Sequence, residues 1–344
     1  MVALDRHLAS IENLGTSFVR ANLDWPQLEP VPPAGSHAYN YHVLDRWVGA
    51  LAAHGLRWYA VGVGTPAWAA DRQALALGCS IYSPPADPQD FAKAMAAVAS
   101  RYGRDGTYWR EYPAQNYRPV VEYEVWNEPN ASASWCPGPD PVAYGELVEA
   151  ASAAIHEVDP DAKVIMGGLA PFLESRSASG DTRAVQGFES FLVEAANATP
   201  GVREAIDVVG IHAYGDDPEA VARQVAGYRD ATIAAGMPQV PLSLNETGWT
   251  TQGSGAFEPV PEAMRADYMR EVTGAIASSN CGIASLSPHT WTTEETDPQN
   301  QEHWFGIASR ESGRPYPTAT AYGETIREYP PGSEVDPTNS ICGD

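Results

Sequence analysis

Short segments rich in β-branched residues alternate with helical segments along this chain, and few folds accommodate such an alternation. Seven segments have the length and composition of strands: 16–25, 57–64, 120–128, 162–169, 207–214, 240–249 and 283–291. The segments between them carry apolar residues three and four positions apart, as Leu44, Val48 and Leu51 do. Strands that alternate with helices predict an α/β fold with a parallel sheet and helices outside it.

The faces of the predicted strands favour a barrel over an open sheet. Polar side chains share one face of the first and last candidates: Arg20, Asn22 and Asp24, and then Ser285, Ser287, His289 and Trp291. An open doubly wound sheet buries both faces and shows continuous apolar runs. We therefore expect a (β/α)₈ barrel, also called a TIM barrel, with polar residues in its upper interior.

The strand count is one short of a barrel. The chain opens on a predicted helix, 5–14, where a barrel would open on its first strand. We expect the first strand, and any signal peptide, to lie upstream of Met1; the alternative is that another segment replaces it. Residues 1–330 are expected to form one catalytic barrel domain. Residues 331–344, rich in Pro, Gly and Ser, are expected to form an irregular tail.

Charge excludes several classes of partner. The chain has 44 acidic and 21 basic residues, for a formal net charge of −23. Such a surface repels phosphate backbones and anionic lipids, so we expect no nucleic-acid or membrane partner. A neutral substrate such as a sugar is unaffected by this field. No apolar run is long enough for a transmembrane helix.

Two glutamates end two of the predicted strands. Glu128 lies in VEYEVWNEPN and Glu246 in PLSLNETGW, and a closed barrel would bring them face to face. Cleaving an acetal requires one carboxyl group to protonate the leaving oxygen and a second to stabilise the anomeric carbon. Pro129 predicts an extended backbone at Glu128. A lone glutamate at a strand end would more often form a surface ion pair, but two in these contexts favour catalysis.

These motifs carry a family resemblance. VWNEPN and SLNETGW resemble the acid/base and nucleophile strands of the clan A glycoside hydrolases. GTSFVRANLDWPQLEP, VGVGTPAWA and VVGIHAYG also resemble strands of this clan and look most like glycoside hydrolase family 39, with family 5 as the next choice. The resemblance extends from residue 5 to about residue 310.

The resemblance implies a retaining hydrolase of O-glycosidic bonds, with β-linked substrates favoured. Glu128 would be the general acid and then the base, and Glu246 the nucleophile. Asn127 would bind the sugar 2-hydroxyl. Arg20 would orient Glu246 and keep it ionised; the alternative is that Arg20 neutralises a buried carboxylate such as Glu124 or Asp24.

The same resemblance, together with loop position, suggests further substrate contacts. His212 and Tyr214 would line the pocket, and Tyr214 would touch Glu246; each could instead be a core residue. Trp291 would form the stacking floor for the sugar. Trp135, in a loop at the same end, is a further candidate for stacking, or else anchors its loop.

The four cysteines allow three pairings, which their positions narrow. Cys79 and Cys136 follow neighbouring strand candidates, whereas Cys281 precedes the last strand candidate and Cys342 lies in the tail. We predict the disulfides Cys79–Cys136 and Cys281–Cys342, and hence an oxidising, extracellular location. Four free thiols in a cytoplasmic enzyme are the alternative.

No cofactor or metal is expected. Gly62, Gly64 and Ala67 have the spacing of a dinucleotide-binding turn, but Pro66 and Trp68 crowd the place of the pyrophosphate. HExxH, CxxC and GxSxG motifs are absent from the sequence. A non-catalytic sugar-binding barrel and an inverting hydrolase remain as alternatives. The sequence predicts an oligo- or polysaccharide as partner and leaves the sugar, the cleavage mode and any protein partner open.

Overall fold

One sheet of seven parallel strands forms the centre of the molecule. The computed structural model describes residues 2–171, 185–199, 201–330, 333, 335–336 and 339–343. The strands follow one another in chain order across the sheet, and every neighbouring pair is parallel. They are β1 (Phe18–Asp24), β2 (Arg57–Val63), β3 (Glu122–Val125), β4 (Lys163–Leu169), β5 (Val208–His212), β6 (Leu242–Thr247) and β7 (Ile283–Pro288). All seven predicted strands are confirmed, although β3 ends before residue 128.

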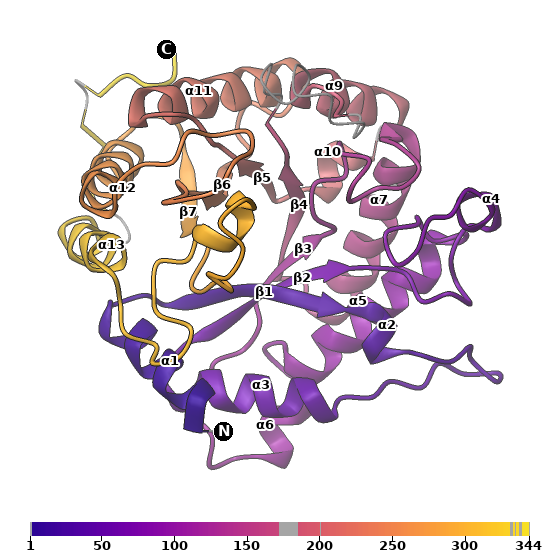
Figure 1. Ribbon diagram of the computed structural model, residues 1–344. Helices are drawn as coiled ribbons and strands as arrows, with labels where there is room; N and C mark the ends of the chain where they lie inside the picture. Colours follow the sequence, from indigo (N-terminus) through magenta and orange to yellow (C-terminus); the bar gives the residue numbers. More distant parts are fainter. Residues whose placement is uncertain are drawn as a thin grey trace.

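Helices surround the sheet as an outer layer, as Figure 1 shows. The helices are α1 (Val2–Asn13), α2 (Trp25–Leu28), α3 (His42–Ala53), α4 (Arg72–Ala76), α5 (Pro88–Tyr102), α6 (Thr107–Glu111), α7 (Pro141–Val158), α9 (Phe188–Ala198), α10 (Val202–Ala205), α11 (Pro218–Ala234), α12 (Glu262–Ala277), the 3₁₀ helix η1 (Gln301–Trp304) and α13 (Pro317–Glu328). Several begin with an aspartate cap followed by proline, as Asp140 and Pro141 do at α7. The predicted opening helix is confirmed as α1.

The main core lies between the sheet and this helical layer. Buried aromatic and aliphatic side chains of β2 and β3 pack there against α5 and α7. Gly62 permits this packing, because a Cβ at its position would collide with Sδ of Met95 on α5. Gly62 therefore serves close packing of helix on sheet.

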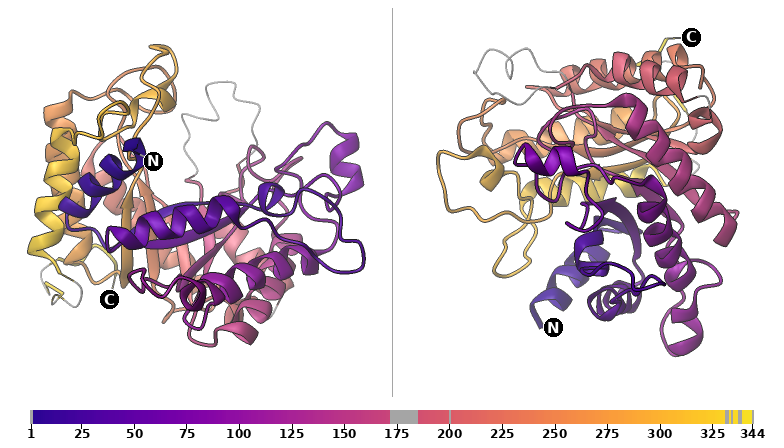
Figure 2. Two further views of the ribbon diagram at one scale, coloured as in Figure 1. Left: turned by 90° about the horizontal axis from the view of Figure 1, so that it is seen from below. Right: turned by 90° about the vertical axis from the view of Figure 1, so that its right-hand side faces the viewer.

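The sheet curls into part of a barrel, with β1 and β7 as its two edges (Figure 2). The strands β2 to β6 are almost wholly buried, whereas most residues of β1 and β7 are only half-buried. A cavity of about 800 Å³ is lined by both edge strands. The seven described strands thus form an open, barrel-like sheet, and they do not themselves close the predicted eight-stranded ring.

Both predicted disulfides are present. Cys79 pairs with Cys136, which joins the loops that follow β2 and β3. Cys281 pairs with Cys342, which ties the end of the chain to the residues before β7. The expectation of an irregular tail stays a prediction, since part of 331–344 lies outside the described residues. In the described part of the chain, no helix has the length and apolarity needed to cross a membrane.

Removing the disulfide at the end of the chain is expected to destabilise the protein. A bridge spanning 61 residues removes much conformational freedom from the unfolded chain. We expect the double substitution Cys281→Ser and Cys342→Ser to lower the free energy of unfolding by about 2–4 kcal/mol. Urea denaturation measures this loss. Ser340→Ala, at an exposed position of the same tail, should leave the unfolding midpoint unchanged.

Candidate active site

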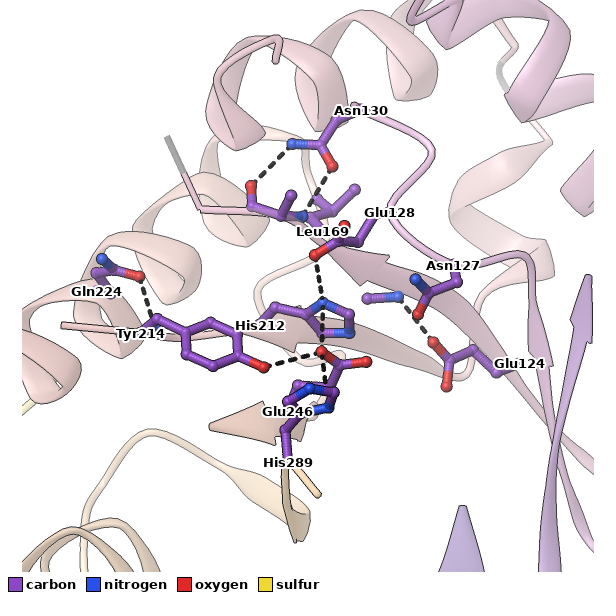
Figure 3. Close-up of polar contacts among 12 residues, drawn as sticks. Glu124, Asn127, Glu128, Asn130, Leu169, His212, Tyr214, Gln224, Glu246 and His289 are labelled. Carbon is purple, nitrogen blue, oxygen red and sulfur yellow. Dashed lines mark hydrogen bonds and ion pairs between the residues drawn. The ribbon is translucent and has the colours of Figure 1, made fainter. Parts of the chain in front are cut away.

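Polar side chains from five strands converge at the carboxyl end of the sheet. Glu246 belongs to β6 and lies beside His212 of β5 in the strand register. Glu128 follows β3, Arg20 belongs to β1, and His289 follows β7. Figure 3 shows Glu246 between His212 and His289, with Glu128 above His212. In a barrel-like sheet this end is where loops can vary without disturbing the core, and active sites form there.

The backbone at Glu128 differs from the predicted extended conformation. Trp126 has φ 70° and Glu128 has φ 46°, so both residues lie in the left-handed region. Such conformations cost about 1–3 kcal/mol each and recur at functional sites. Hydrogen bonds to other segments hold them, because the Glu128 amide donates to the Gly168 carbonyl of β4 at 3.0 Å and the Trp126 indole donates to the Ser134 carbonyl at 2.6 Å. The prediction was wrong because these contacts outweigh the preference that Pro129 imposes.

Asn130 fixes the loop that carries Glu128. Its side chain is buried, accepts from the Ala170 amide at 2.8 Å, and donates to the carbonyls of Ala170 and Gln186. The loop is therefore clamped to the end of β4. Residues 172–184, which follow the end of β4, lie outside the described residues.

Glu128 and Glu246 meet across one imidazole. One carboxylate oxygen of Glu128, one of Glu246 and one ring nitrogen of His212 all lie within 4.8 Å of one another. His212 Nδ1 is 3.0 Å from Glu128 Oε1 and 3.5 Å from Glu246 Oε2. His212 is completely buried, and Nε2 has no hydrogen-bond partner among the residues that the structure describes. Both groups near Nδ1 are carboxylate oxygens, which accept hydrogen bonds, so we assign a hydrogen to Nδ1 as the donor.

Glycine at position 168 makes room for this imidazole. A Cβ there would collide with Nε2 and Cδ2 of His212. The Gly168 amide also donates to Glu124 Oε1 at 2.9 Å. The backbone of β4 thus approaches both His212 and Glu124 as closely as a glycine allows.

Arg20 joins the nucleophile candidate to a second, buried carboxylate. Its Nη1 donates to Glu246 Oε1 at 2.8 Å, while Nε and Nη2 donate to the two oxygens of Glu124 at 2.8 and 2.9 Å. Nη2 also donates to Asn127 Oδ1 at 2.8 Å. Arg20 therefore contacts both the nucleophile candidate Glu246 and the buried Glu124, which were weighed as alternative partners, and its role toward Glu246 stays a prediction. The other expected partner, Asp24, instead accepts from Gln27.

Electrostatics keep Glu246 ionised. Burial alone would raise the pKa of Glu246, but the charges of His212, His289 and Arg20 and a hydrogen bond from Tyr214 outweigh burial and hold that pKa well below its usual range. Tyr214 donates to Glu246 Oε2 at 2.9 Å, as predicted. Burial, and then the charge of Glu246, raise the pKa of Tyr214, so its hydroxyl stays protonated and remains a donor.

Replacing Arg20 is expected to be costly for folding. Arg20→Met leaves Glu124 fully buried without its counter-charge. We expect the free energy of unfolding at neutral pH to fall by about 3–5 kcal/mol. Urea denaturation tests this, with Arg270→Met as the control. Arg270 of α12 forms exposed ion pairs with Asp267 of the same helix and Glu324 of α13, so its removal should change stability by less than about 1 kcal/mol. Equal losses in the two variants would contradict this account of Arg20.

Two predicted tryptophan contacts have different outcomes. Trp135 is 1% exposed and packs between Trp126 and Tyr144, so the prediction that it stacks on a sugar is wrong: protein covers its ring. Trp291 is half-buried and lines the same cavity as Arg20 and Glu246. Its indole donates to His7 Nδ1 at 2.9 Å, and its role as a stacking floor stays a prediction.

Sequence reasoning missed two residues of this site. Glu124 was weighed only as a partner for Arg20, yet it holds both Arg20 and the backbone of β4. His289 received no role, although it shares the polar strand face that singled out Trp291. In the described part of the chain, Glu128, His212 and Glu246 also form the one group of such side chains whose ligand atoms lie close enough to hold a metal ion.

Solved structures show what this fold resembles. No protein-family model and no curated protein matches the chain. A family 39 glycoside hydrolase from Bacteroides cellulosilyticus has a TM-score of 0.64 at 18% identity, covering 94% of this chain and 61% of that one. A family 39 β-xylosidase from Caulobacter crescentus has a TM-score of 0.58 at 21% identity, covering 92% and 66%.

The similarity extends beyond family 39. A family 5 enzyme from Bifidobacterium longum has a TM-score of 0.64 at 15% identity, covering 96% of this chain and 74% of that one. The chain spans less than two thirds of the length of the two family 39 structures. At these identities the comparison shows a shared fold, which agrees with the barrel-like sheet described above.

Proposed function

We propose that this chain is a retaining glycoside hydrolase that cleaves β-linked O-glycosidic bonds of an oligo- or polysaccharide. One observation carries the proposal: carboxylate oxygens of Glu128 and Glu246 lie within 4.8 Å of each other at the carboxyl end of the sheet. Retaining enzymes hold their two carboxyl groups about 5–5.5 Å apart, and inverting enzymes about 6.5–9.5 Å. The short separation favours double displacement over the inverting alternative.

In the first step Glu246 acts as the nucleophile. Its ionised carboxylate attacks the anomeric carbon and forms a covalent ester with the sugar, while the bond from that carbon to the leaving oxygen breaks. Glu128 gives its proton to the leaving oxygen. Arg20 holds Oε1 and Tyr214 holds Oε2 of Glu246, so the carboxylate is positioned before substrate binds.

In the second step Glu128 acts as the base. It takes a proton from water, the water oxygen bonds to the anomeric carbon, and the ester to Glu246 breaks. Two displacements at one carbon restore its configuration. His212 Nδ1 lies nearer to Glu128 than to Glu246 and orients the acid/base group throughout. Asn127, held by Arg20, is placed to meet the sugar 2-hydroxyl.

Fold and location complete the proposal. We infer that one further parallel strand between β1 and β7 would complete a (β/α)₈ barrel, because these two edge strands line one cavity. Two disulfides favour an oxidising compartment and hence an extracellular protein. The acidic surface suits a neutral saccharide better than a polyanion.

A substrate panel tests the proposed reaction. Candidates are 4-nitrophenyl β-xylosides, β-glucosides and arabinosides, together with defined oligosaccharides and exopolysaccharides whose products are sized by mass. Proton NMR on the best substrate should show the β-anomer as the first product. An α-anomer formed first would indicate inversion, and saccharide binding without turnover across the panel would favour the non-catalytic sugar-binding alternative.

A further inference from the structure

His289 lies against the nucleophile candidate without a role in the scheme above. It follows β7 directly, and its Nδ1 is 3.6 Å from Glu246 Oε2. The side chain is 30% exposed and lines the cavity that also reaches Arg20 and Glu246. Figure 3 shows it on the opposite side of the Glu246 carboxylate from His212.

The ring of His289 is held in place by aromatic edges. It makes T-shaped contacts with Tyr214, at a centroid distance of 6.3 Å, and with Phe305, at 5.5 Å. The His289 amide donates to the Thr247 carbonyl at 2.8 Å, so the backbone is fixed as well. Packing therefore sets where the imidazole lies, and a ring nitrogen faces Glu246 within ion-pair distance.

The other hydrogen-bond donors around Glu246 leave its Oε2 able to accept a further hydrogen bond from His289. Arg20 occupies Oε1, and Tyr214 donates to Oε2. His212 is 3.5 Å from Oε2 but closer, at 3.0 Å, to Glu128, so its single Nδ1 hydrogen is directed mainly to Glu128. His289 is then the remaining nitrogen donor near Oε2. Donor distances of this kind commonly shorten when substrate binds.

We propose that His289 is a positioning residue for the nucleophile, donating from Nδ1 to Oε2 of Glu246 and favouring release of the sugar from Glu246 in the second step. The inference rests on the proposed function. In the first step the carboxylate loses negative charge, so a donor to Oε2 gives the transition state no advantage. In the second step that charge returns as the ester breaks, and the donor stabilises it.

The consequence is an unequal effect on the two steps. His289→Phe keeps a planar ring against Tyr214 and Phe305 but removes the donor. With a 2,4-dinitrophenyl glycoside, whose leaving group makes the first step fast, we expect kcat to fall about tenfold. We expect kcat/KM to change by less than about threefold, so KM falls with kcat. Rapid mixing should show a burst of dinitrophenol as the covalent intermediate accumulates.

A matched variant separates positioning from packing. His289→Asn returns an N–H donor close to the place of Nδ1 without the aromatic ring, and it should restore kcat to within about threefold of the wild type. If His289 served only packing, His289→Asn would lower kcat and kcat/KM together, because it lacks the aromatic ring. His289→Phe would then keep the wild-type values. That pattern, or an unchanged kcat in His289→Phe, would overturn the inference while leaving the hydrolase proposal intact. A wild-type protein that turns over no glycoside would overturn both.

Discussion

Glu246→Ala is expected to lower hydrolysis of every glycoside substrate by at least about 10⁴-fold, because removing a nucleophile removes the covalent route entirely. Four side chains surround the Glu246 carboxylate: Arg20, Tyr214, His212 and His289. None of these four can replace the attack of the carboxylate on the anomeric carbon. Initial rates on the best aryl glycoside measure the loss. Added azide should restore part of the turnover and give a glycosyl azide of inverted configuration, since a small anion fits where the carboxylate was.

Glu271→Gln is the control for this prediction. Glu271 is exposed on α12, the helix that follows β6, so its amide variant carries the same charge change far from the site. Its rates should equal those of the wild type. Residual hydrolysis in Glu246→Ala above about 0.01% of the wild-type rate, the level that a 10⁴-fold loss leaves, would contradict the assignment of Glu246 as nucleophile.

Glu128→Gln is expected to separate substrates by their leaving groups. Loss of the acid should slow cleavage of natural oligosaccharides by about 10³-fold or more, because an alkoxide departs poorly without a proton. A 2,4-dinitrophenyl glycoside needs no protonation, so its first step should stay within about tenfold of the wild-type rate. Water then attacks without a base, and the covalent intermediate should accumulate as a burst of dinitrophenol.

Most of the sheet could be predicted from sequence periodicity. Each of the seven strand segments contains β-branched residues, and the polar face of β1 carries Arg20, which does reach Glu246. The end of β3 could not be predicted. Trp126 favours a strand whereas Asn127 and Glu128 do not, so residue propensity does not set the boundary. Tertiary hydrogen bonds, such as that of the Glu128 amide to the Gly168 carbonyl, hold the left-handed backbone there.

Motif and face assignments predicted the site in part. Glu128, Glu246, Arg20 and Tyr214 came from motifs whose chemistry is local to a strand end, and the structure brings them together. Trp135 could not be placed, since a loop tryptophan can turn inward or outward and here packs inward. His289 lay on the correct strand face, but its distance to Glu246 depends on how strongly the sheet curls.

Trapping of a covalent intermediate tests the central claim most directly. A 2-deoxy-2-fluoro glycoside of the preferred sugar, with a dinitrophenyl leaving group, slows both steps but allows the first to proceed. The account predicts one sugar per protein by intact mass, and after proteolysis a labelled peptide that contains Glu246 within LSLNETGW. A label on any other residue, or hydrolysis of the parent glycoside with inverted configuration and no trapped adduct, would contradict it.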